Sequence, residues 1–216
     1  MLNFGFGHDF QLISTSSIVL NPRGRHYVAL KSHMNTYEDT YFDEDALVME
    51  HNSRDLAQRV QIIDENSYAL CEFLRSRSVA EGTPSAVIKE VFYPKYTTST
   101  HYLRCKRPEG GYGGLFSLTF TSLDASMAFY DALPCYKGMN LGTNFTLASA
   151  YTALAFHNRL EWAAQYGVEE GLVRISVGME ERGWLLRSFD TALKTAESAV
   201  ECLLRAHDPT EPLSRY

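Results

Sequence analysis

Apolar side chains recur every three or four positions in two long stretches of the chain. Between Leu56 and Phe73 they follow the period of an α-helix, with polar residues between them, and we expect this helix to end near Ser76. A second stripe predicts a long C-terminal helix with one face in the core. Its members are Leu185, Phe189, Ala192, Ala196, Ala199 and Leu203.

Shorter segments predict the remaining elements. Strands are expected where β-branched and aromatic residues gather between turn-forming residues, namely at residues 17–20, 86–93 and 114–120 and around Arg174. Helices are expected at about residues 26–33, from Ser122 to Leu133 and at about residues 151–166. Ser122 is the expected N-cap of the second of these, because its hydroxyl can accept a bond from a free backbone N–H.

The segment Glu81-Gly-Thr-Pro84 marks the expected boundary between two parts of the chain, because Gly and Pro end a helix and begin a connection. The expected order of elements in residues 83–216 is strand, strand, helix, turn segment, helix, strand, helix. This order predicts an α+β fold with a mainly antiparallel sheet and helices on one face. Residues 1–82 form the other part, with a short strand and the first long helix.

Composition excludes several classes of function. The 216 residues, 45% of them hydrophobic, suffice for a buried core, and the net charge of −6 argues against nucleic-acid binding, which needs a basic surface. We find no export signal and no apolar run long enough for a membrane, so the expected compartment is the cytoplasm. The four cysteines are far apart and the seven histidines lack ligand spacing, which predicts reduced thiols and no metal site.

The candidate chemistry centres on the segment Gly171–Glu180. Here Val173 and Ile175 alternate with Arg174, so a strand would carry the guanidinium to one face of the sheet. Because an arginine binds a carboxylate through two parallel hydrogen bonds, Arg174 is a candidate ligand of a small acid. The pattern alone is equally consistent with a structural ion pair between Arg174 and Glu180 or another acid.

Four further segments carry a family resemblance. They are FDEDALVMEHNSRD at residues 42–55, VFYPKY at 91–96, GGYGGLFS at 110–117 and KGMNLGTNFTL at 137–147. In this order, and leading into the Arg174 strand, they resemble fungal cystathionine gamma-synthases, which are pyridoxal-phosphate-dependent transsulfuration enzymes. The resemblance covers nearly the whole chain beyond residue 20 and corresponds to the C-terminal part of such an enzyme.

The resemblance implies the C-terminal small domain of a fold-type I pyridoxal-phosphate enzyme, preceded by a remnant strand and long helix of the cofactor domain. It implies pyridoxal 5'-phosphate as cofactor, a small amino acid as substrate and gamma-replacement on an activated homoserine. Arg174 matches the arginine that holds the substrate α-carboxylate. Asn144 and Thr146 match the loop that completes this pocket, and they are candidate secondary contacts with the substrate.

One segment of the family pattern is not found. In the relatives, the lysine that forms a Schiff base with the cofactor precedes the strand matched by residues 17–20, whereas residues 12–20 contain no lysine. The first lysine of the chain, Lys31, lies past that strand. The large cofactor domain has no counterpart either, so we expect the chain to hold no catalytic residue and to be inactive by itself.

Two alternatives remain open. A non-catalytic chain of this kind would expose apolar faces, through which it would bind a full-length relative or form a homo-oligomer. An enzyme of specialised metabolism would use the same chemistry with a carbon nucleophile. These residues do not distinguish a carbon acceptor from a thiol acceptor. The glycines of residues 110–114 precede a strand rather than open a helix, so we expect them to permit a tight turn rather than to bind phosphate.

Overall fold

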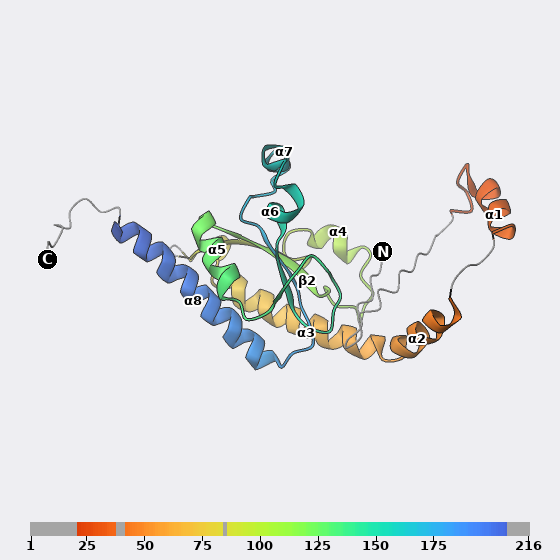
Figure 1. Ribbon diagram of the computed structural model, residues 1–216, viewed down its shortest axis with the longest axis horizontal. Coiled ribbons are helices and arrows are strands. Elements are labelled where there is room, and N and C mark those ends of the chain that lie inside the picture. The colour runs from red at the N-terminus through yellow and green to blue at the C-terminus, as the bar shows by residue number, and fades with distance from the viewer. Residues whose placement is uncertain (1–20, 38–41, 84–85, 207–216) are drawn as a thin grey trace.

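The computed structural model describes residues 21–37, 42–83 and 86–206 (Figure 1). Its body is a sheet with helices packed on it, and α1 and α2 extend from one end. The expected strand at residues 17–20 lies outside the described residues. The helices are α1 (Tyr27–Asn35), α2 (Asp43–Ser53), α3 (Leu56–Arg75), the 3-10 helix η1 (Val79–Glu81), α4 (Ser99–Leu103), α5 (Leu123–Ala132), α6 (Tyr151–Phe156), α7 (Leu160–Ala164) and α8 (Arg182–Ala206).

Five strands form one mixed sheet in the order β1-β2-β5-β4-β3. They are β1 (Ile88–Phe92), β2 (Leu115–Phe120), β3 (Tyr136–Lys137), β4 (Leu147–Ala150) and β5 (Val173–Ser176). Neighbouring strands are antiparallel except β3, which runs parallel to β4. The predicted α+β class is therefore confirmed, and the parallel edge strand makes the sheet mixed.

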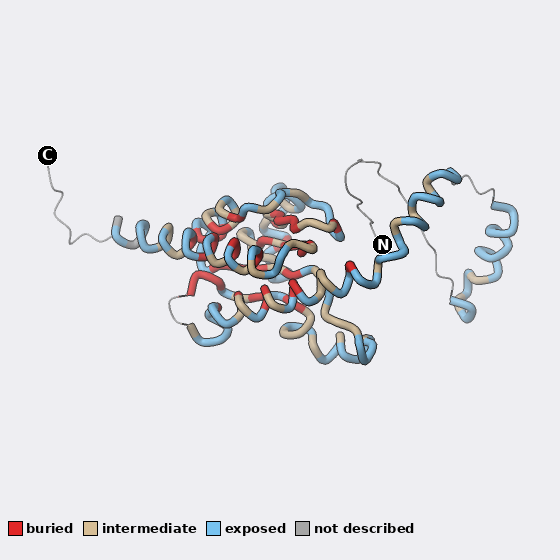
Figure 2. Tube along the Cα trace, turned by 90° about the horizontal axis from the view of Figure 1, so that it is seen from below, coloured by how far each residue is buried: buried red, intermediate tan, exposed pale blue. Residues whose placement is uncertain are grey.

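The core lies between the sheet and helices α3, α5 and α8. Side chains from β2 and β5 meet Phe129 of α5 and Phe189 of α8, whose rings lie 6.0 Å apart. Figure 2 shows that buried residues concentrate in this body, whereas α1 and α2 are almost wholly exposed. The side chains of Val173 and Ile175 lie in the core between the sheet and the helices. Because successive side chains of a strand alternate between its faces, the side chain of Arg174 lies on the opposite face of the sheet.

Three expectations differ from the structure. The helix expected over residues 151–166 is interrupted between α6 and α7, where Asn158 lies in a turn and the N–H of Arg159 donates to the carbonyl of Phe156. The short strands β3 and β4 flank the turn segment expected at residues 140–147, where no strand was predicted. Leu203, expected in the core stripe, is 41% exposed because α8 runs past the end of the sheet body.

The glycine-rich turn before β2 packs directly on Asp64 of α3. One carboxylate oxygen of Asp64 accepts hydrogen bonds from the backbone N–H groups of Tyr112 and Gly113, both at 2.6 Å. A Cβ atom at Gly111 would lie 1.8 Å from the other carboxylate oxygen. The turn therefore closes on a protein carboxylate, and this agrees with the expected packing role of these glycines.

Replacing Asp64 with alanine is expected to lower the free energy of unfolding by about 1–3 kcal/mol, because two backbone donors lose a charged acceptor. Urea denaturation followed by circular dichroism measures this change. Glu65→Ala is the matched control on the same helix, since Glu65 has only exposed interactions, an ion pair with Arg182 and a hydrogen bond from Gln61, which should contribute less than about 1 kcal/mol. Equal effects of the two substitutions would contradict the role given to Asp64.

Candidate functional site

Arg174 lies in the middle of the sheet on β5. It is directly opposite Ser117 of β2 and Ser149 of β4, so these three side chains share one face. Its Nη2 donates to the backbone carbonyl of Met139 at 2.6 Å, and its guanidinium carbon lies 4.9 Å from the centre of the Tyr151 ring. The guanidinium is thus held between a loop carbonyl and an aromatic face.

The surroundings of Arg174 are poor in negative charge. Partial burial lowers the pKa of its guanidinium, while the neighbouring Tyr151 acts in the opposite direction. An arginine stays protonated at neutral pH despite such a shift. Within the described part of the chain Arg174 forms no salt bridge, and the carboxylate of Glu180 binds Thr146 instead. In the described residues the structure therefore shows no ion pair between Arg174 and Glu180.

The loop between β3 and β4 lies over the face that carries Arg174. Besides the bond from Arg174 to Met139, the backbone N–H of Gly142 donates to the hydroxyl of Ser176, two residues along the same strand, at 3.1 Å. Gly142 has a φ of 74°, a conformation that glycine adopts without strain. The sequence prediction that this loop accompanies Arg174 agrees with these two contacts.

Asn144 and Thr146, the two other predicted site residues, are engaged by protein groups. The Asn144 side-chain oxygen accepts from Arg59 at 3.4 Å, and its backbone carbonyl accepts from the N–H of Met179 at 2.8 Å. Thr146 is fully buried, and its hydroxyl donates to Glu180 at 2.8 Å and accepts from the N–H of Gly178 at 3.0 Å. Both residues hold the loop to the turn after β5, and their contact with a substrate remains a prediction.

Sequence reasoning did not find the residues that anchor this loop. Asn66 of α3 is buried and donates from its side-chain amide to the carbonyls of Gly178 and Glu180. The sequence signal that could have found Asn66 is that it is a polar residue within the apolar stripe of α3. Arg59 is buried on the same helix and also bonds to Asp55, and an i,i+4 spacing of this kind is typical of an exposed pair on a helix surface.

Replacing Thr146 with valine is expected to lower the free energy of unfolding by about 1–3 kcal/mol, because Glu180 loses a donor and Gly178 loses an acceptor at a buried position. Thr146→Ser keeps the hydroxyl and should recover most of this loss. Chemical denaturation of both variants beside the wild type measures the difference. If valine were tolerated as well as serine, the hydroxyl would not be holding the loop.

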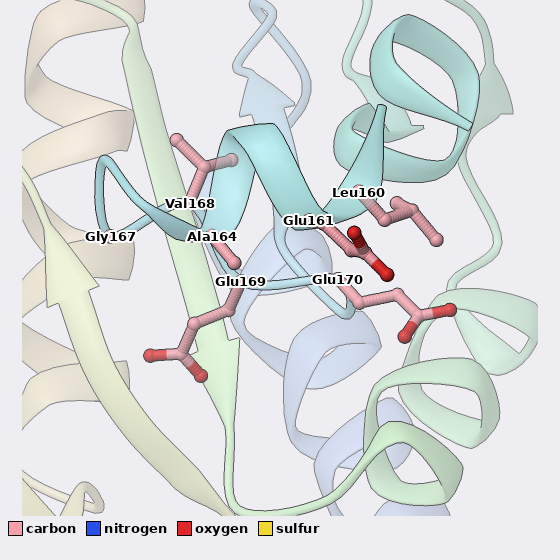
Figure 3. Close-up of a pocket in the computed structure, with 7 residues that line it drawn as sticks. All are labelled: Leu160, Glu161, Ala164, Gly167, Val168, Glu169 and Glu170. Carbon is pink, nitrogen blue, oxygen red and sulfur yellow. The ribbon is translucent and has the colours of Figure 1, made fainter. Parts of the chain in front are cut away.

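A shallow pocket lies elsewhere, along α7 and the loop that follows it (Figure 3). Its volume is about 360 Å³, and none of the predicted site residues is among those that line it, which are Leu160, Glu161, Ala164, Gly167, Val168, Glu169 and Glu170. The Glu169 carboxylate binds Lys89 at 2.8 Å, and Figure 3 shows the carboxylates of Glu169 and Glu170 pointing in different directions. Since none of the predicted site residues lines this pocket, Arg174 and its loop remain the candidate site.

None of the helices within residues 21–37, 42–83 and 86–206 combines the length and apolar character that crossing a membrane requires. The same residues contain no group of three or more His, Cys, Asp or Glu side chains placed to bind a metal ion.

Comparison with known proteins identifies the class. The model of the family described as Cys/Met metabolism PLP-dependent enzyme matches residues 24–194, and the chain belongs to this family. Pyridoxal phosphate is accordingly the cofactor of the family, as the sequence resemblance implied.

Several of the similar curated proteins come from fungi. The chain is 59% identical over 198 residues to the cystathionine gamma-synthase-like enzyme iboG1 of Amanita muscaria, a match that covers 85% of this chain and 33% of that protein. It is 44% identical over 181 residues to the cystathionine gamma-synthase of Neurospora crassa, which covers 83% and 28% respectively. The chain thus spans about a third of the length of these relatives, and the predicted resemblance is confirmed.

Solved structures agree with this assignment. Cystathionine gamma-synthase from Xanthomonas oryzae pv. oryzae, in complex with cystathionine, matches with a TM-score of 0.59 at 27% identity, over 72% of this chain and 39% of that chain. Cystathionine gamma-lyase from yeast matches with a TM-score of 0.66 at 24% identity, over 79% and 43%, and supports the fold alone.

The residues of this chain do not fit pyridoxal phosphate by themselves. The cofactor aldehyde needs a lysine, and all lysines of the chain lie in the described ranges. Each of them interacts with a partner outside the group formed by Arg174, Met139 and Tyr151. These partners are the Tyr27 ring for Lys31, Glu169 for Lys89, Glu72 for Lys95, the Arg107 carbonyl for Lys106, the Leu133 carbonyl for Lys137 and Asp190 for Lys194.

Proposed function

We propose that this chain is the substrate-carboxylate part of a pyridoxal-phosphate-dependent enzyme of the cystathionine gamma-synthase type, which performs gamma-replacement on an activated homoserine in the cytoplasm. Residues 83–216 would form the small domain, and residues 1–82 a remnant of the cofactor domain with its connecting helix. The observation that carries the proposal is the partly buried guanidinium of Arg174, which has no acidic partner in the described residues. The family assignment supports it independently.

The role proposed for this chain is to hold the acid end of an amino acid. Arginine carries five N–H donors in a planar fork, and Arg174 uses Nη2 for the Met139 carbonyl. The remaining donors suit the two oxygens of an α-carboxylate, and partial burial strengthens that interaction relative to water. Asn144 and Thr146 would keep the loop closed over this site and add secondary contacts with the substrate.

The lysine for the cofactor would have to come from residues outside this chain. The chain mixed with pyridoxal phosphate and reduced with borohydride should therefore show no stoichiometric cofactor label on one lysine by peptide mass spectrometry. A single lysine labelled to completion would show that the chain supplies the amine itself, and it would remove this part of the proposal.

A chimera tests the proposed function itself. In it, this chain replaces the matching third of the Neurospora crassa cystathionine gamma-synthase, and the assay measures formation of cystathionine. The chimera is expected to be active, and this chain alone inactive. A folded chimera that binds pyridoxal phosphate but makes no cystathionine would count against the assignment.

A second candidate is a non-catalytic chain that binds a full-length relative. The observation in its favour is that α1 and α2 contain no buried residue and expose apolar side chains, among them Val28 at 79% and Leu47 at 69%. Co-expression with full-length iboG1 followed by affinity purification distinguishes this candidate from the enzyme function proposed above. Recovery of a stoichiometric complex supports this candidate, and a monodisperse monomer in analytical ultracentrifugation opposes it.

A further inference from the structure

Tyr151 is fixed relative to Arg174 by the backbone. It is the first residue of α6 and follows β4 directly. Its N–H donates to the carbonyl of Leu172 at 3.1 Å, just before β5 begins. The segment that carries the ring is therefore tied to the strand that carries the guanidinium, and the two groups meet at 4.9 Å.

The ring of Tyr151 also contacts a second aromatic ring. Phe156, at the end of α6, makes an edge contact with it at 5.9 Å between ring centres. Trp162 of α7 lies 5.9 Å from Phe156, and Tyr166 lies 4.9 Å from Trp162. Figure 1 shows α6 and α7 projecting from the sheet body, so this row of rings continues from the Arg174 site into the projection.

We propose that Tyr151 is a positioning residue, whose ring fixes the guanidinium of Arg174 in the orientation that receives the substrate carboxylate. This inference rests on the carboxylate-binding role proposed for Arg174. A long arginine side chain loses rotamer freedom when it binds a ligand, and a side chain that is already immobilised avoids that cost. The cation–π contact and the hydrogen bond to the Met139 carbonyl together restrain the planar group.

Nuclear magnetic resonance of the Arg174 side chain in the 216-residue chain tests the inference. The Nε–H signal is assigned by its loss in Arg174→Lys, and its exchange rate with water reports how firmly the group is held. In Tyr151→Leu the exchange rate should rise about threefold to tenfold, the range expected when one cation–π contact is lost. Tyr151→Phe keeps the aromatic face and should behave as the wild type.

Tyr68→Leu is the matched control. Its ring lies 4.2 Å from the ammonium of Lys95 in a separate cluster, so this variant removes another cation–π contact and should leave the Arg174 signal unchanged. If Tyr151→Leu does not fold, Tyr151→Met tests the same loss with a flexible side chain of similar reach. An Arg174 signal that exchanges equally fast in the wild type and in the folded Leu or Met variant overturns the inference.

A titration separates this inference from the proposed function. L-alanine, a small amino acid with a free carboxylate, is added to the wild type, Tyr151→Phe and Tyr151→Leu while the Arg174 signal is observed. Affinity should fall about threefold to tenfold in Tyr151→Leu alone. Equal affinity in all three proteins would overturn the positioning role, whereas no response of the Arg174 signal in any of them would count against carboxylate binding by Arg174.

Discussion

Replacing Phe189 with alanine is expected to lower the free energy of unfolding by about 3–5 kcal/mol, the largest single effect in the core. The side chain is 1% exposed, and its ring contacts Phe116 of the sheet at 6.4 Å and Phe129 of α5 at 6.0 Å between ring centres. Alanine leaves a cavity where α5, α8 and the sheet meet. Urea denaturation followed by circular dichroism measures the change.

Phe42→Ala is the matched control for this prediction. Phe42 precedes α2 and is 62% exposed, so its loss should change stability by no more than about 0.5 kcal/mol. Similar unfolding midpoints for the two variants would show that Phe189 does not hold the helices to the sheet.

Replacing Gly178 with alanine is expected to lower stability by about 3 kcal/mol, because a new methyl group overpacks the loop beside the site. A Cβ atom here would lie 2.4 Å from the backbone of Phe145, which neither segment can relieve by turning a side chain. The N–H of Gly178 donates to Thr146 and its carbonyl accepts from Asn66, so a shift would disturb both anchors of the loop. Faster hydrogen exchange over residues 139–146 should accompany the loss of stability.

Gly138→Ala is the control for the glycine prediction. A Cβ atom at Gly138 would lie 3.8 Å from Leu147, an ordinary contact, so this change should cost less than about 1 kcal/mol. Equal stability of the two alanine variants, with unchanged exchange in the loop, would mean that the segments at 145 and 178 do not pack as closely as the structure shows.

Local periodicity predicted the larger part of the fold. The stripes of α3 and α8 and the alternation in β2 and β5 each follow from side chains that must face one core, and the Ser122 hydroxyl caps α5 as expected, accepting from the N–H of Ala125 at 3.1 Å. The short strands β3 and β4 gave no such signal, because two to four residues are too few to establish a period. The interruption between α6 and α7 was missed because the polar His157, Asn158 and Arg159 are flanked by apolar residues on both sides.

The candidate site was predictable only in part. Arg174 stands out because a charged residue interrupts an apolar strand, and this signal lies within a few residues of sequence. The bonds from Arg59 to Asn144 and from Asn66 to Gly178 join positions separated by 85 and 112 residues. Such contacts depend on how α3 meets the turn after β5, and no local pattern encodes that approach. For the same reason, the ring of Tyr151 beneath Arg174 was not expected.

The kinetics of Arg174→Ala in the chimera with the Neurospora crassa enzyme test the assignment of Arg174 most directly. Because the variant leaves the substrate carboxylate without its charged partner, kcat/KM for the amino-acid substrate should fall at least about hundredfold, mainly through a higher KM. Arg187→Ala removes an arginine whose side chain is 73% exposed and should leave both parameters unchanged. A folded Arg174→Ala chimera with the KM and kcat of its parent would contradict the role of Arg174 in binding the carboxylate.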